Sequence, residues 1–186
     1  MQVSGRVIIL AAFGLAIAMS GGAWWYHYTQ VRQAAAFWGS PGGRLLVRGP
    51  EVTFYELGDV AEEADGKVAE TMAGRPVVSS SDLSGKPGLV HLRHALYQDS
   101  SFQWEGRRRE AVDAADDWVY AVRFAEGPEE MTAVFTRDFS RVGRVTGDEV
   151  DVLPSPRISD SVRRYLTDIG AVNDAATGAK PQAADR

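Results

Sequence analysis

The sequence predicts an α+β protein: a single N-terminal transmembrane helix followed by a small, mostly antiparallel β domain with a C-terminal amphipathic helix. Three observations lead to this fold class. The segment Val7–Tyr26 contains twenty residues and no charge, which is the length of helix that crosses a bilayer. About seven later stretches alternate apolar and polar residues, as half-buried strands do. The last apolar pattern, from Val162 to Ile169, has helical spacing.

The N-terminal segment is expected to remain as a membrane anchor. It ends in Trp24, Trp25, Tyr26 and Tyr28, and amphipathic rings at that position lie at the level of the lipid headgroups. An alternative stays open, because Ala16-Ile17-Ala18 matches a signal-peptidase site and residues 1–23 would then be removed as a signal peptide. A short tail carrying only Arg6 favours an N-in orientation, with the domain in the periplasm at a bacterial inner membrane.

The chain is expected to divide into an anchor helix and stalk (1–38), a linker (39–43), a soluble α+β domain (44–170) and a disordered tail (171–186). Residues Thr29–Trp38 contain good helix formers and no breaker, so the anchor helix should continue there as a stalk. Glycines and a proline in residues 39–43 should end that helix. The tail is rich in small and polar residues.

In the first half of the domain the pattern predicts short strands, one weak helix and one loop. The strands are Leu45–Arg48, Val52–Leu57, Val77–Val78 and Leu89–Leu96, the helix is Asp59–Ala73, and the loop is Ser79–Gly88. The clearest strand is Leu89–Leu96, in which Val90, Leu92, His94 and Leu96 would share one face.

The second half of the domain is predicted to be mainly hairpins. The pattern favours an extended Phe102–Trp104, a loop or short helix over Arg107–Asp117, strands at Trp118–Phe124, Met131–Phe135, Val142–Val145 and Val150–Leu153, and a helix with N-cap Ser159 and a stop at Gly170. Trp118, Tyr120, Val122 and Phe124 should lie on one face of their strand and form core.

Composition excludes several function classes. All 25 acidic residues follow Tyr28, whereas Arg6 is the only one of the 20 basic residues that precedes it. The domain is therefore acidic, which disfavours binding to nucleic acid. Cysteine is absent, and this excludes disulfides, thiolate catalysis and cysteine-based metal centres.

Two histidines and an aspartate, His91, His94 and Asp99, are the candidate metal ligands. On a helix the i, i+3 spacing of the histidines would place them on one face, but on a strand their odd separation points them to opposite faces. Because the strand pattern is the stronger one, the sequence predicts no metal site.

Nucleotide-binding and hydrolase motifs are also absent. Gly85-Lys86 does not make a phosphate loop, since Ser80 stands where the first glycine is required and Pro87 where a hydroxyl residue is required. No catalytic residue, cofactor or small-molecule ligand is predicted. The basic cluster Arg107-Arg108-Arg109 could dock an acidic partner or lipid headgroups, or be a solvated loop balanced by Glu105 and Glu110.

Two short segments resemble known groups of proteins. Residues Ser81–Val90, SDLSGKPGLV, resemble the segment that leads into a buried strand in membrane-anchored thioredoxin-like proteins, but the Cys-x-x-Cys that follows there is missing, so the resemblance implies no redox activity. The first 40 residues, with Gly5-Arg6-Val7, Trp25-Tyr26, Gln30-Val31 and Phe37, resemble uncharacterised single-span proteins of alphaproteobacteria. That resemblance implies a location in the cell envelope and no particular activity.

These observations favour a non-enzymatic accessory or assembly protein of a bacterial inner-membrane complex. It would act through protein–protein interaction with an integral-membrane partner. One alternative is a membrane-tethered enzyme or metal-binding protein that uses His91 and His94 with acidic residues. Another is a small-ligand or lipid-binding β domain in which Trp118, Tyr120 and Phe124 line a cavity.

Overall fold

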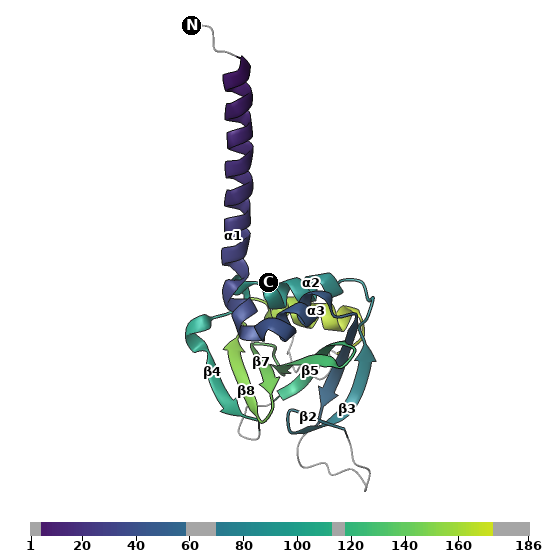
Figure 1. Cartoon of the computed structure of the whole chain (residues 1–186). Coiled ribbons are helices and arrows are strands. Elements are labelled where there is room, and N and C mark those ends of the chain that lie inside the picture. Colours follow the sequence, from purple (N-terminus) through teal and green to yellow (C-terminus); the bar gives the residue numbers. More distant parts are fainter. Residues whose placement is uncertain (1–4, 59–69, 113–117, 173–186) are drawn as a thin grey trace, which may run out of the picture.

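The computed structural model describes residues 5–58, 70–112 and 118–172 and confirms an α+β fold with an antiparallel sheet. A long helix, α1 (Gly5–Arg48), stands out from the domain over its N-terminal part (Figure 1). Its C-terminal part lies with α2 (Leu89–Tyr97) and α3 (Ser159–Asp168) over one face of the curled sheet.

The sheet has eight strands in the order β2-β3-β1-β5-β6-β7-β8-β4, and every neighbouring pair is antiparallel. The strands are β1 (Glu51–Leu57), β2 (Thr71–Met72), β3 (Arg75–Asp82), β4 (Arg108–Ala111), β5 (Trp118–Glu126), β6 (Glu129–Thr136), β7 (Arg141–Thr146) and β8 (Glu149–Pro154). Two 3-10 turns, η1 (Asp99–Ser101) and η2 (Trp104–Gly106), connect α2 to β4.

Six predicted strands are confirmed, and in the longer ones alternate side chains pack into apolar clusters on the two faces of the sheet. They are the strands expected at Val52–Leu57, Val77–Val78, Trp118–Phe124, Met131–Phe135, Val142–Val145 and Val150–Leu153. The predicted common face of Trp118 and Tyr120 is wrong. The register of β5 shifts between these two residues, so that Trp118 belongs to the cluster on one face of the sheet and Tyr120 to the cluster on the other.

Both faces of the sheet are filled by apolar side chains. The larger cluster joins the helices to Phe54, Tyr120 and Phe124, and the smaller one is built around Trp118 on the opposite face. Trp118, Tyr120 and Phe124 are each at most 1% exposed. The aromatic face that could have lined a cavity is therefore packed core.

The prediction of a strand at Leu45–Arg48 is wrong, because α1 resumes after a kink. Gly39 has φ 72° and ψ 172°, and helical geometry continues through Pro41 to Arg48. A proline is compatible with the first turn of a helix, where its missing N–H would have no partner. Residues 39–43, expected as a linker, thus hold the kink and the start of a second helical stretch that buries Leu45 and Leu46 completely.

The prediction of a strand at Leu89–Leu96 is also wrong, because these residues form α2. Leu89, Leu92 and Leu96 are buried, whereas Val90 is 67% exposed. The apolar residues of this segment fit both the two-residue repeat of a strand and the repeat of a helix. The helix buries all three leucines, whereas one face of a strand would hold only two of them. Gly88, with φ 86°, turns the chain into the helix from a conformation that other residues rarely adopt.

Three smaller expectations also fail. Ser79–Asp82 continue β3 and pair with β1 instead of forming a loop, and Arg108–Ala111 form the edge strand β4 instead of a loop or helix. Ser159 does not cap α3, since the N-cap is Ile158 and the Ser159 hydroxyl donates to the Pro156 carbonyl at 3.0 Å.

Some predictions fall partly or wholly outside the described residues. Of the helix expected over Asp59–Ala73, residues 59–69 are not described, and Thr71–Met72 form β2. The tail is described only to Val172, which is buried beside α3. Among the described residues, no helix combines the length and the hydropathy needed to cross a membrane.

Candidate functional site

Asp99 fastens α1 to the domain. One oxygen of its carboxylate accepts the backbone N–H of Gln33 at 3.0 Å and the other accepts that of Ala34 at 2.7 Å. A carboxylate that accepts two successive helix N–H groups acts as it would at a helix N-terminus. Asp99 starts η1, so this contact ties the connection after α2 to the middle of α1.

Two aromatic residues of the expected stalk lie in the core of the domain. Phe37 and Trp38 are at most 1% exposed, with their rings edge to face at 4.7 Å. The Trp38 indole N–H donates to the Leu96 carbonyl of α2 at 2.6 Å. The residues expected to hold the domain away from the membrane are therefore part of the domain.

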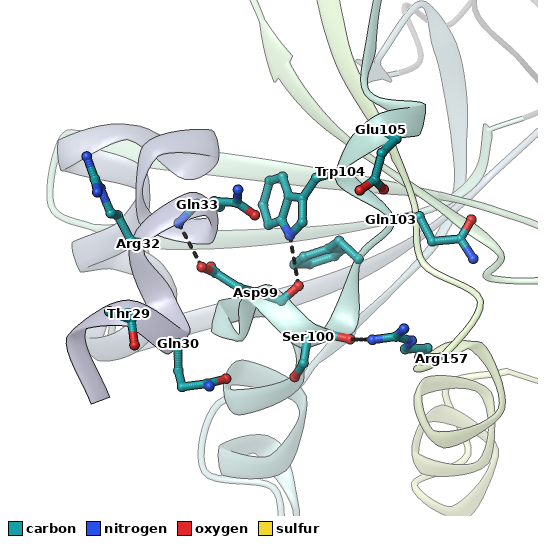
Figure 2. Close-up of a pocket in the computed structure, with 11 residues that line it drawn as sticks. Thr29, Gln30, Arg32, Gln33, Asp99, Ser100, Gln103, Trp104, Glu105 and Arg157 are labelled. Carbon is teal, nitrogen blue, oxygen red and sulfur yellow. Dashed lines mark hydrogen bonds between the residues drawn. The ribbon is translucent and has the colours of Figure 1, made fainter. Parts of the chain in front are cut away.

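A polar pocket opens beside this junction. Its volume is about 580 Å³, and it is lined by residues from 29–33 of α1, by residues from 99–105 and by Arg157. Figure 2 shows Asp99 between α1 and Trp104, with Arg157 on the side opposite α1. The Trp104 indole N–H donates to the Asp99 carbonyl at 2.9 Å, and Arg157 donates to the Ser100 carbonyl at 3.0 Å.

A second polar cluster gathers three arginines around the carboxylate of Asp151. Arg109 Nε lies 3.0 Å from it, Arg144 Nη2 3.1 Å and Arg107 Nη2 3.4 Å. Burial raises the pKa of Asp151, but the hydrogen bond from Arg109 and the charges of the three arginines outweigh this and leave its pKa lowered. The carboxylate is thus held ionised inside the fold.

The Arg107 and Arg144 guanidiniums also lie over the Phe37 ring, at 5.6 and 5.9 Å from its centre. The arginine cluster and the pocket therefore share α1 as a common wall. In the predicted docking cluster, Arg107 and Arg109 bind Asp151, and Arg108 pairs with Glu110. The docking role stays a prediction, and an acidic partner would have to compete with these carboxylates.

His91 and His94 lie on a helix, so the prediction that they point to opposite faces is wrong. Both are exposed on α2 at an i, i+3 spacing, and His94 Nε2 is hydrogen-bonded to the Gln98 amide at 2.7 Å. Within the part of the chain that the structure describes, no group of three or more His, Cys, Asp or Glu side chains could hold a metal ion. Asp99 uses its carboxylate on α1 instead.

The aromatic residues expected at a membrane interface lie on α1 outside the domain. Trp24, Trp25 and Tyr26 are 64–67% exposed, Tyr28 is 46% exposed, and the rings of Trp24 and Tyr28 stack at 5.7 Å. Sequence reasoning missed the pocket and the partners of Asp151, because their residues come from distant parts of the chain. The only available signal was an acidic residue, Asp99, directly after an amphipathic segment.

No protein-family model matches this chain, and no curated protein or solved structure matches it.

Proposed function

We propose that the protein is an accessory or assembly protein of a bacterial inner-membrane complex. The N-terminal part of α1 attaches it to the membrane, and its domain contacts an integral-membrane partner. A single observation carries the proposal: α1 leaves the domain with large apolar side chains exposed over more than half of its circumference. These residues are Ile9, Leu10, Phe13, Leu15, Ile17 and Met19, each 60–71% exposed.

Their positions rule out a one-sided docking face. Successive helical residues are about 100° apart, so the six large residues span about 220° of the circumference of α1, and small apolar residues such as Gly14 and Ala18 occupy the remaining arc. A helix that is apolar all round is buried either in a large core or in a membrane. Nothing in the described part of the chain covers these residues, and the charge-free run is the length of a bilayer core.

The aromatic residues support the same placement. Trp24, Trp25, Tyr26 and Tyr28 follow the aliphatic stretch directly, and Thr29 and Gln30 come next. This order, from aliphatic to aromatic to polar, is that of a helix which passes from hydrocarbon through the headgroup layer into water.

The proposed mode of action is binding, because the domain offers a closed core. Both faces of its sheet are packed, and its acidic charge disfavours nucleic acid. An attached domain meets membrane-bound partners at a raised effective concentration without any additional contact. We place the N-terminus in the cytoplasm and the domain in the periplasm.

Alkaline carbonate extraction of membranes tests the attachment. Since the described residues contain no helix that meets the criteria for a span, the measurement has to separate integral from peripheral attachment. We expect the wild type to stay in the pellet. Ile17→Arg should move it to the supernatant, because an arginine at the centre of a spanning helix costs about 3 kcal/mol.

Val78→Arg is the matched control, since Val78 is an equally exposed apolar residue on the domain, at 62%. It should leave the protein in the pellet. A wild-type protein found in the soluble fraction before any wash would contradict membrane attachment, and one that salt or carbonate releases from the membranes would contradict an integral anchor.

The absence of cysteine allows the orientation to be mapped by single substitutions. In intact spheroplasts, a membrane-impermeant maleimide should label Ser161→Cys but not Gln2→Cys, and the reverse pattern would contradict a periplasmic domain. Crosslinking in native membranes should capture an integral-membrane protein. Purification as a lone monomer with no crosslinked partner would contradict the accessory role.

A further inference from the structure

We propose that the pocket between α1 and the η1–η2 segment binds the headgroup of a zwitterionic phospholipid, with a phosphate beside a primary amine. This inference rests on the proposed membrane attachment. It assigns a ligand to a cavity of about 580 Å³ that the closed core of the domain does not explain.

The first argument is depth. The α1 wall of the pocket is Thr29–Gln33, which begins one residue after Tyr28. At about 1.5 Å per residue, this wall lies within about 8 Å of the aromatic residues along the helix axis. The headgroup layer on each side of a bilayer is about 5–8 Å thick. If the aromatic residues lie at the interface, the pocket opens at the depth of the headgroups.

The second argument is the charge that the pocket presents. Figure 2 shows Glu105, Gln103 and Arg157 on the side opposite α1, and Arg32 directed away from them on α1. Both carboxylate oxygens of Asp99 already accept backbone N–H groups of α1. Arg157 gives one nitrogen to the Ser100 carbonyl, which leaves its remaining N–H groups for a phosphate.

Glu105 supplies the complementary charge. It is exposed, and within the described residues its carboxylate has neither an ion pair nor a hydrogen bond. One arginine and one carboxylate on the same side of a pocket match a phosphate and an ammonium that are joined by a short linker. The geometry thus favours a ligand with both charges over an anion alone.

The overall charge of the chain argues against an anionic headgroup. The net charge is −5, and an acidic domain is repelled by an acidic lipid surface. A trimethylammonium group has no N–H to donate to Glu105, so a primary amine fits this carboxylate better. These two points select an ethanolamine-type headgroup.

Lipid retention by the full-length protein tests the proposal. The protein is purified in mild detergent, incubated with equal amounts of dioleoyl phosphatidylethanolamine, phosphatidylglycerol and phosphatidylcholine, and analysed by native mass spectrometry. We expect preferential retention of phosphatidylethanolamine. Arg157→Gln and Glu105→Gln should each reduce that retention about tenfold.

Arg164→Gln and Glu51→Gln are charge-matched controls, because both residues are exposed and neither lines the pocket. They should retain the lipid like the wild type, and all four variants should melt at the wild-type temperature. Equal retention of the three lipids, a preference for phosphatidylglycerol or phosphatidylcholine, or unchanged retention by both pocket variants would overturn the proposal. Equally tight binding of soluble glycerophosphoethanolamine would overturn the assignment to a lipid.

The two proposals fail in different ways. If the wild type is extracted from membranes by salt, the proposed attachment is wrong whatever the lipid preference in detergent. If the wild type resists carbonate but shows no lipid preference, the attachment stands and the headgroup site is wrong.

Discussion

Asp151 on β8 lies directly opposite Arg144 of β7 and Arg109 of β4, so one carboxylate is the cross-strand partner of an arginine on each side. Its side chain is 5% exposed, whereas the side chains of Arg109 and Arg144 are 58% and 20% exposed. The buried charge therefore holds together three strands at the end of the sheet. Through Arg144 and Arg107 it also reaches the Phe37 ring of α1.

Asp151→Asn should lower the free energy of unfolding by about 2 kcal/mol at neutral pH, because charge-assisted hydrogen bonds to the arginines become neutral ones. Urea denaturation measures the change. Asp148→Asn, at an exposed residue directly before β8, is the control and should change stability by less than about 0.5 kcal/mol. Equal effects of the two substitutions would show that the cluster adds nothing.

The effect of Asp151→Asn should depend on pH. The pKa of Asp151 is lowered in the folded protein, so its contribution is fully present above the unfolded pKa of about 3.9 and is lost as the pH falls through the folded value. The difference in unfolding free energy between wild type and Asp151→Asn should therefore shrink below about pH 4. A difference that stays constant from pH 6 to pH 2 would contradict an ionised carboxylate at this position.

Gly39→Ala should destabilise the protein by about 1–3 kcal/mol. Gly39 has φ 72° and ψ 172°, a region that only glycine occupies without strain, and a Cβ there would approach Arg144 Nη1 to 2.9 Å. Gly147→Ala separates strain from crowding, since Gly147 also has positive φ but nothing within 4 Å. Thermal melting should show a larger loss at position 39, and an equal loss would mean that the kink has no special cost.

Arg93→Met should lower the free energy of unfolding by about 3 kcal/mol. The Arg93 guanidinium donates to the carbonyls of Leu46 at 2.7 Å and Gly49 at 2.5 Å, and lies over the Phe124 ring. Its removal leaves carbonyls at the end of α1 without their donors. Arg93→Lys should restore part of the loss, because an ammonium reaches fewer acceptors. Indistinguishable denaturation curves for Met and Lys would contradict a hydrogen-bonding role.

Asp99→Ala should loosen the attachment of α1 to the domain, with a loss of about 1 kcal/mol, as when a helix-capping carboxylate is removed. The local readout is amide hydrogen exchange at Gln33 and Ala34, whose N–H groups now bind Asp99. Exchange there should accelerate while amides of β5 and β6 keep their rates. Unchanged exchange at both positions would show that Asp99 does not hold the helix.

The sequence predicted correctly those strands in which a two-residue alternation of apolar and polar residues is followed or preceded by a recognisable turn. The hairpins β5–β6 and β7–β8 turn at Gly127 and Gly147, each with positive φ, and the glycines mark both turns in the sequence. The prediction of a strand at Leu89–Leu96 failed because the apolar residues of this segment fit both the two-residue repeat of a strand and the 3.6-residue repeat of a helix. The choice depended on how many leucines the rest of the fold could bury, which is a tertiary property.

The prediction of a strand at Leu45–Arg48 failed for another reason. Gly39 was correctly identified as an interruption of the helix, but Pro41, which was also expected to end it, lies in the first turn of the helical stretch that follows. The pocket and the Asp151 cluster could not be predicted from spacing, because Asp99, Arg157 and α1 meet only once the sheet has brought them together. The helical conformation of α1 through Trp38, in contrast, was predictable from the sequence.

The kink at Gly39 and the burial of Phe37 and Trp38 define how α1 meets the domain. A domain on a slack tether would present all its faces in turn and would lose much rotational freedom on capture. Here the helix is built into the core on both sides of the kink, so its direction sets the direction of the whole domain. If α1 anchors the protein as proposed, a partner would meet a pre-aligned surface, because the entropy cost of orienting the domain is largely met during folding.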